Sequence, residues 1–348
     1  MRPVPRLCSL AALGLFGSTA PAWAQSTVQI YGLLDLGVGQ FQNAGGLKLK
    51  RLDSGNYSTS HLGFRGTENL GGSLRAGFTL ESFLQMDTGN AGRVTNVDAF
   101  WGRNANINLS GSFGNVRLGR MGPPLFVSTL SFNPFGDSFG YSPAIRQYYS
   151  LPAGTPLVGD SGWNNSVSYT TPTMSGLTAT ATVAAGEGAA TSRGKNLGAN
   201  AIYRAGPLGL TAAWQNVKTQ GTLGRPIAAF PGFASQSAYQ VGGSYDLKVV
   251  RLFAQYGRIS TDANLDVDTT NLHIGASVPL GRGSLLAAYG TSKVDVAGPT
   301  PERTSKIMTL GYDYPLSKRT NIYTVYMSDK FTGLATGTTY AAGIRHRF

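Results

Sequence analysis

The chain has 348 residues, of which only 13% are charged, and it contains 47 glycines, 16 tyrosines and 16 phenylalanines. Soluble domains typically carry about 25% charged residues, and the many aromatic residues exclude a disordered chain. Few charges, much glycine and many aromatic residues are typical of a protein with many strands, tight turns and an apolar outer face.

The beginning of the chain has the pattern of a secretion signal. Arg2 and Arg6 give a positive start, a short apolar stretch follows, and Ala22–Ala24 (AWA) matches a cleavage site. The apolar stretch is shorter than the about 20 residues that a membrane-spanning helix needs. We therefore expect residues 1–24 to be a cleaved signal peptide and residues 25–348 to form the mature chain as one domain.

The formal net charge is +12, and removal of Arg2 and Arg6 leaves +10. The basic residues are scattered singly along the chain, and an exported protein does not meet DNA, so we expect no nucleic-acid partner. The single cysteine, Cys8, lies in the signal, so the mature chain can form no disulfide. The basic surplus suits anionic solutes, or lipid phosphates at the rims of a barrel.

After residue 24, apolar and polar residues alternate with a period of two. Leu272, Ile274, Ala276 and Val278, for example, alternate with polar or small residues from Asn271 to Ser277. No stretch is a continuous apolar run of membrane-helix length. Each alternating segment therefore predicts a strand with one apolar and one polar face.

The connections between the alternating segments are of two kinds. The short ones are Thr67–Gly71, Gly111–Gly114, Pro172–Ser175, Gly206–Pro207, Asp246–Lys248, Pro279–Arg282 and Tyr314–Lys318. The long, polar ones are Phe41–Asn56, Met86–Thr95, Gly122–Gly162, Ala185–Asn196, Thr219–Ser235, Thr261–Asp266, Val294–Glu302 and Asp329–Gly337. The two kinds alternate along the chain, which predicts about sixteen antiparallel strands in a transmembrane β-barrel with short periplasmic turns and long extracellular loops.

The last strand supports this interpretation. Tyr340, Ile344 and Phe348 lie on its apolar face, and Arg345 and Arg347 lie on the other. A terminal aromatic residue after alternating apolar residues belongs at the membrane interface. We expect Tyr340, Ile344 and Phe348 to form the C-terminal signal that the barrel-assembly machinery reads.

Several segments also resemble a known family, the trimeric general porins of Gram-negative bacteria, in particular its β-proteobacterial branch. They occur in family order along the mature chain, and the ordered set is more specific than any one of them. These segments are Val28–Gly39 (VQIYGLLDLGVG), Ser60–Glu81, Leu109–Arg120 (LSGSFGNVRLGR), Asn133–Asp137 (NPFGD), Asn165–Pro172, Tyr314–Thr320 and Gly343–Phe348.

The resemblance implies a sixteen-stranded barrel that forms a homotrimer and whose third long loop, Gly122–Gly162, folds into the pore and narrows it. Acidic residues of that loop would face basic residues of the wall, and Asp137 matches the family's loop pattern best. The family often carries arginine where this chain has His61 and Gly162, while Arg103 is retained at a third such position. The two altered positions put a strong preference for anions in doubt, so we expect a weak one.

The candidate constriction and selectivity residues come from the polar faces of the strands, from the resemblance and from the third loop. They are His61, Arg65, Arg75, Glu81, Arg103, Arg117, Asp137 and Arg146. The alternation would turn Arg103 outward with Ala105, whereas the resemblance turns it into the pore. Arg120 lies on the apolar face of its strand, and we expect it to contact the second long loop of a neighbouring subunit.

Residues for enzymatic chemistry do not come together in the sequence. The three histidines, His61, His273 and His346, lack metal-ligand spacing, and no nucleophile elbow or phosphate-binding glycine loop is present. We therefore predict a passive outer-membrane channel for small hydrophilic solutes and ions, with no enzymatic activity, cofactor or metal. A substrate-specific channel for an organic anion or phosphate is the alternative, and a barrel enzyme or adhesin is an alternative of another class. The expected partners are the other subunits, outer-membrane lipid and lipopolysaccharide, the assembly machinery and the solutes.

Overall fold

The computed structural model describes residues 27–93, 98–150, 157–186, 195–218 and 230–348. The predicted signal peptide, residues 1–24, and parts of four predicted long loops lie outside these residues. Sixteen strands form the barrel: β1 (Thr27–Phe41), β3 (His61–Gly71), β4 (Leu74–Phe83), β5 (Asn104–Gly111), β6 (Gly114–Met121), β7 (Trp163–Thr170), β8 (Leu177–Ala184), β9 (Asn196–Ala205), β10 (Leu208–Val217), β11 (Ser235–Asp246), β12 (Arg251–Asp262), β13 (Val267–Leu280), β14 (Gly283–Val296), β15 (Arg303–Pro315), β16 (Thr320–Phe331) and β17 (Gly337–Arg347).

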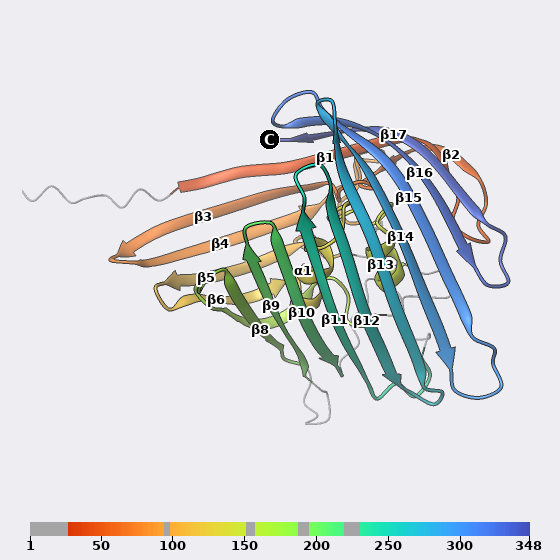
Figure 1. Cartoon of the computed structure of the whole chain (residues 1–348). Coiled ribbons are helices and arrows are strands. Elements are labelled where there is room, and N and C mark those ends of the chain that lie inside the picture. Colours follow the sequence, from red (N-terminus) through yellow and green to blue (C-terminus); the bar gives the residue numbers. More distant parts are fainter. Residues whose placement is uncertain (1–26, 94–97, 151–156, 187–194, 219–229) are drawn as a thin grey trace, which may run out of the picture.

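The barrel closes at β1, which pairs antiparallel with strands on both of its sides (Figure 1). Its first half, Thr27–Leu33, pairs with β3, and Leu33–Gln40 pairs with β17. At the seam the backbone of Phe348 exchanges two hydrogen bonds with Gly32, each 3.2 Å long. Closure gives each of the sixteen strands a hydrogen-bonded neighbour on both sides, as a lipid environment requires.

The predicted first long loop, Phe41–Asn56, is not entirely a loop, and this expectation was wrong in part. It contains a further strand, β2 (Leu49–Ser54), which pairs with Leu36–Phe41 of β1. Because β1 continues beyond the residues that pair with β3, its outer part would otherwise have an open edge. The return of the chain as β2 satisfies the backbone groups along that edge.

The first short turn also lies further along the chain than predicted. Residues 67–71 belong to β3, and the chain reverses at Gly72 and Ser73. Gly71 and Gly72 both have positive φ angles, of 101° and 56°. Glycine adopts these angles without the steric cost that a Cβ brings. The other six predicted short turns fall between the strands where the sequence places them.

The alternation of the two faces is confirmed on β13. Leu272 and Ile274 are 48% and 56% exposed on the outer face, whereas Asn271 and His273 are buried on the inner one. On β17, Tyr340 and Ile344 likewise point outward, and Arg345 is buried inside. Within the described residues, no helix is long and apolar enough to span a membrane.

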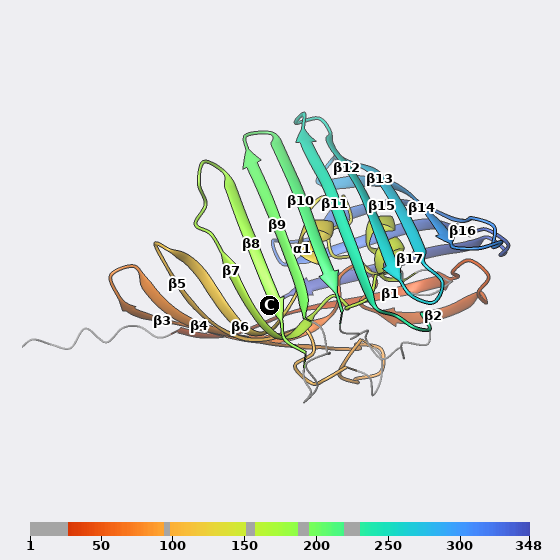
Figure 2. The same cartoon turned by 90° about the horizontal axis from the view of Figure 1, so that it is seen from below.

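The third long loop folds into the barrel, as the resemblance implied. It carries the helices α1 (Pro124–Ser131) and α2 (Pro143–Tyr149), which lie inside the ring of strands (Figure 1 and Figure 2). Helix α1 packs against β8–β11, and α2 packs against β13–β15. The loop therefore covers this part of the inner wall and leaves the remaining lumen beside β3–β6.

Candidate functional site: the lumen beside the third loop

Polar side chains of the wall hold the first half of the third loop in place. Asn200 of β9 donates to the carbonyl of Pro124, at 2.9 Å, and to the hydroxyl of Ser128, at 3.0 Å. Gln255 of β12 donates to the carbonyl of Phe132 at 2.7 Å. These buried amides donate to groups at the start of α1 and just after its end, so this half of the loop is fixed to the wall at both ends of the helix.

The second half of the loop is anchored around α2. The guanidinium of Arg146 lies 2.9 Å from Asp329 Oδ2 on β16 and donates to Asn43 Oδ1 at the same distance. Both charged side chains are almost fully buried. Gln147 contacts His273 on β13, with Nε2 of the histidine 2.8 Å from Oε1. Arg146, predicted as a constriction residue, thus neutralises a buried wall carboxylate and does not present its charge to the open lumen.

The opposite wall gathers several predicted residues around Glu81. Glu81 of β4 accepts a hydrogen bond from Tyr31 at 2.7 Å and another from Asn104, and its Oε2 lies 3.1 Å from Arg103 Nε. Arg65 lies over the ring of Tyr31, with 4.7 Å from the guanidinium carbon to the ring centroid. A single wall, built by β1 and β3–β5, therefore carries a carboxylate with three polar partners and a stacked arginine.

His61 stands at the edge of the same group. Its ring lies 6.4 Å from the ring of Tyr31 in an edge-on arrangement, and its Nδ1 lies 3.0 Å from the carbonyl oxygen of Thr59. The side chain is buried, with 8% exposure. The neighbours of His61 thus include Tyr31 and the loop backbone, and the structure brings together four of the eight predicted residues: His61, Arg65, Glu81 and Arg103.

Arg103 lies on the inner side, beside Glu81 and Asn104. The strand β5 begins only at Asn104, and the backbone at Arg103 is a bend. The alternation of faces therefore does not extend to Arg103. Asn104, Asn106 and Asn108 face the lumen with Glu81, because Glu81 is the register partner of Asn104 and Ile107 is exposed outside.

Arg75 and Arg117 extend this wall toward the short turns. Arg75 of β4 is exposed, and Arg117 of β6 is half-buried, with an Nε that finds no hydrogen-bond partner in the described part of the chain. Within the described residues, neither Arg65, Arg75 nor Arg117 forms an ion pair. Three arginines of β3–β6 thus keep charges that no described carboxylate neutralises.

Asp137 approaches the lumen from the loop. Its Oδ1 accepts a hydrogen bond of 2.9 Å from Ser58, and Ser58 accepts another of 3.0 Å from Arg345 Nη1. The second nitrogen of that guanidinium lies 3.0 Å from Asp313 Oδ2. The loop acid and the wall arginine Arg345 are therefore joined through Ser58, a residue that the sequence did not single out.

The segment that contains Ser58 is held by Asp35. This carboxylate, fully buried on β1, accepts hydrogen bonds from the backbone amides of Tyr57 and Ser58 at 2.7 and 2.9 Å and from Tyr323 at 2.8 Å. Burial raises the pKa of the Tyr57 phenol, so that side chain stays neutral. Asp35 therefore shapes the wall through hydrogen bonds, whereas Glu81 pairs with Arg103.

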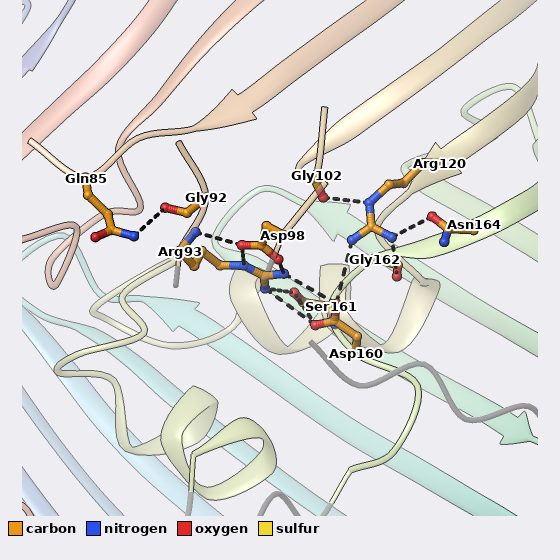
Figure 3. Close-up of polar contacts among 10 residues, drawn as sticks. All are labelled: Gln85, Gly92, Arg93, Asp98, Gly102, Arg120, Asp160, Ser161, Gly162 and Asn164. Atoms are coloured by element: carbon orange, nitrogen blue, oxygen red, sulfur yellow. Dashed lines mark hydrogen bonds and ion pairs between the residues drawn. The ribbon is translucent and has the colours of Figure 1, made fainter. Parts of the chain in front are cut away.

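The second and third long loops contact each other around Arg120, outside the group of residues that surrounds Glu81 (Figure 3). The Nε of Arg120 donates to the carbonyl of Gly102 at 2.6 Å, and Nη1 donates to the carbonyl of Gly162 at 3.1 Å. A Cβ atom at Gly162 would lie 2.9 Å from Nη2 of Arg120. The glycine that replaces an expected arginine thus leaves room for Arg120, which binds the second loop of its own chain.

Figure 3 also shows how Arg93 continues this contact. Its Nη2 lies 3.0 Å from Asp98 Oδ1 and 3.4 Å from Asp160 Oδ2, and its Nη1 donates to Ser161 at 2.8 Å. Asp160 also lies 3.6 Å from Nη2 of Arg120. Two arginines and two aspartates therefore join the base of the second loop to the end of the third.

A cavity of about 480 Å³ lies among the first three long loops. Phe41, Arg51 and Asp53 line it from β1 and β2, Arg93 lines it from the second loop, and Tyr141 lines it from the third. Arg51 and Asp53 form an ion pair of 2.6 Å. The cavity is polar as well as aromatic, and it forms a vestibule on the long-loop side of the third loop.

The arrangement is that of a channel wall. No cluster of histidine, cysteine or carboxylate side chains within the described residues could hold a metal ion. A closed barrel with an apolar outside, a polar inside and an inserted loop is the architecture of an outer-membrane porin.

Comparison with known proteins assigns the chain to a family. A family model described as Gram-negative porin matches residues 9–334. Outer membrane porin protein 32 of Delftia acidovorans is 32% identical over 97% of this chain and 95% of its own length. The chain belongs to the Gram-negative porin family and is a passive diffusion channel of the outer membrane.

Two further similarities agree with this assignment. An outer membrane porin of Bordetella pertussis is 27% identical over 97% of this chain and 99% of its own length. Among solved structures, an anion-selective porin from Comamonas acidovorans matches with a TM-score of 0.76 and 28% identity, over 93% of this chain and all of that chain. OmpT of Vibrio cholerae in its trimer form matches with a TM-score of 0.67 at 15% identity, a similarity of fold alone.

Proposed function

We propose that the pore prefers anions weakly and that its preference arises on the wall formed by β3–β6. The observation that carries this proposal is that three arginines across the lumen from the third loop form no ion pair with any described residue: Arg65, Arg75 and Arg117. Fixed positive charge along a wall lowers the energy of a passing anion and raises that of a cation. The similar porin from Comamonas acidovorans is itself anion-selective.

The preference is weak because carboxylates stand beside the same path. Glu81 neutralises Arg103, and Asp137 approaches from the third loop. Of the three positions where the family often has arginine, only Arg103 keeps a charge, since His61 is buried beside Tyr31 and Gly162 has no side chain. The wall therefore carries a local surplus of positive charge, which the carboxylates of Glu81 and Asp137 partly neutralise.

The experiment is solute entry into proteoliposomes that contain the purified mature protein. Small anionic, neutral and cationic solutes of matched size should all enter, the anionic one fastest by a few-fold, with rates that rise linearly with concentration. Saturation by one organic anion or by phosphate would instead support a substrate-specific channel. Equal rates for anionic and cationic solutes would contradict the proposed preference.

We also propose how the chain is exported, inserted into the membrane and assembled into a trimer. Residues 1–24 act as a cleaved signal, and Tyr340, Ile344 and Phe348 present an outward aromatic face to the assembly machinery. The mature chain forms a homotrimer in a membrane of lipid and lipopolysaccharide and catalyses no reaction. Arg120 supports the trimer indirectly, because it holds the chain's own second loop at Gly102. Chemical cross-linking of the native membrane should yield a trimer.

A further inference from the structure

The vestibule among the first three long loops has the size of a binding site. Its volume of about 480 Å³ lies within the range of about 300–1,000 Å³ that is typical of small-molecule sites. Solutes that enter from the long-loop side pass the vestibule before they reach the narrowing at the third loop. Groups that bind a solute here therefore act before the charges of the lumen wall do.

The strand β2 forms one wall of the vestibule. Leu49, Arg51 and Asp53 alternate along this strand, and all three line the cavity. Leu49 is the register partner of Phe41, which is buried inside the barrel. Residues directly opposite each other in an antiparallel pair lie on the same face of the sheet. The pairing of β2 with the end of β1 therefore turns these three side chains inward.

The ion pair between Arg51 and Asp53 leaves one donor and one acceptor free. Nε and Nη2 of Arg51 both donate to Oδ2 of Asp53, at 3.0 and 2.6 Å. Within the described residues, Oδ1 of the aspartate accepts no hydrogen bond and Nη1 of the arginine donates none. The two side chains are 48% and 19% exposed. Two adjacent hydroxyl groups of a sugar ring match this arrangement, because one can donate to Oδ1 while the other accepts from Nη1.

The charges that line the vestibule are compensated, which favours a neutral ligand. Besides Arg51, the cavity is lined by Arg93 and Arg146. Arg93 lies 3.0 Å from Asp98, and Arg146 lies 2.9 Å from Asp329. A carboxylate or phosphate group of a ligand would be repelled by the aspartate beside Arg51. The arginines of the lumen wall attract such an anion, whereas the vestibule does not.

Apolar side chains lie beside these polar groups. Leu49 is 44% exposed, and Phe139 lines the cavity from the third loop. The ring of Phe139 is supported by that of Phe126, with 5.9 Å between the two centroids. A sugar ring carries its hydroxyl groups around its edge and C–H groups on its faces, and C–H groups pack favourably against aliphatic and aromatic side chains. The vestibule thus offers both surfaces that such a ring needs.

We propose that the vestibule binds a neutral mono- or disaccharide. Arg51 and Asp53 bind two adjacent hydroxyl groups, and Leu49 and Phe139 contact a face of the ring. Binding at the mouth raises the local concentration of sugar, so sugar entry saturates while solutes without this pattern of groups diffuse freely. The inference rests on the channel function and does not depend on the proposed ion preference.

The test measures the ion current through the purified mature protein in a planar bilayer, with maltose added on the long-loop side. Maltose should interrupt the current with a saturating dependence on concentration, beyond the linear fall that the viscosity of the solution causes. Gluconate, an anion with similar hydroxyl groups, should not compete with maltose. The double variant Arg51→Ala, Asp53→Ala removes both binding groups without a change of net charge. Its half-saturating maltose concentration should rise about tenfold or more.

The matched control is Arg258→Ala, Asp268→Ala, which removes an exposed ion pair of 2.9 Å from the outer face of the barrel and should change nothing. Leu49→Ala keeps the ion pair of the vestibule and should weaken maltose binding a few-fold. The proposal would be overturned by the absence of saturable interruption, by an unchanged double variant, by an equal loss in the control or by competition from gluconate. The reversal potential is measured in the same bilayers, so a loss of ion preference with maltose binding intact would contradict only the proposed preference.

Discussion

Reversing the charge of Arg103 is the sharpest perturbation of the selective wall. Its Nε lies 3.1 Å from Glu81, and its side chain is 27% exposed to the lumen. The substitution Arg103→Glu converts a neutral pair into two adjacent carboxylates. The charge of the wall opposite the third loop then falls by two units, while Asp137 and the anchors of the loop are untouched.

The size of the effect follows from Coulomb's law. Two unit charges acting on an ion about 8 Å away contribute about 1 kcal/mol at the dielectric constant of water. The barrier rises by this amount for an anion and falls by it for a cation, which changes the permeability ratio about thirtyfold. Screening with a Debye length of about 10 Å at 0.1 M salt reduces the change to about fivefold.

The assay is the reversal potential of the variant in a planar bilayer, across a potassium chloride gradient. We expect the chloride-to-potassium permeability ratio to fall about fivefold, with a larger fall at low salt. Lys318→Glu, the same reversal of charge at a short turn, should leave the ratio unchanged. If Arg103→Glu also left it unchanged, Arg103 would have no place on the ion path and the reasoning would be refuted.

Three further predictions concern other residues of the barrel. Glu81→Gln keeps the shape of the side chain but leaves Arg103 unpaired, so the reversal potential should shift toward chloride; a shift toward potassium would contradict the pairing. Arg146→Met leaves the buried Asp329 carboxylate without its ion-pair partner and should cost about 3 kcal/mol, seen as a lower unfolding temperature; Arg146→Met combined with Asp329→Asn should recover part of that loss, and no recovery would argue against the ion pair as the cause. Phe348→Ala removes the outward aromatic residue at the seam and should slow insertion into the membrane, measured by the heat-modifiable mobility of newly made protein; insertion at the normal rate would exclude Phe348 from the signal.

The strands were predictable because the membrane and the lumen impose a period of two on each of them. Leu272 and Asn271 could be assigned to opposite faces from the sequence, since one contacts lipid and the other water or the loop. The difference between short and long connections was equally visible. What the alternation could not show was β2, because its pairing depends on how far β1 extends beyond β3, a property of two distant segments.

The candidate site was predictable only in part. The inward orientation of Glu81 and Arg65 follows from the alternation of faces along their strands. Arg103 precedes the first residue of β5, so the alternation does not predict its orientation. Arg146 carries a charge within a loop that enters the pore, and nothing local indicates that Asp329, on a distant strand, neutralises it. The roles of Asp35 and Ser58 likewise depend on contacts between residues far apart in the chain.

We propose that each barrel is a water-filled channel with a weakly anion-preferring wall. It is tested most directly by single-channel recording of the purified mature protein in a planar bilayer, with the reversal potential measured across a potassium chloride gradient. We expect large, stepwise openings that occur in groups of three, a conductance proportional to salt concentration and a modest shift toward the chloride potential. A folded barrel without conductance, or one that prefers potassium, would contradict it.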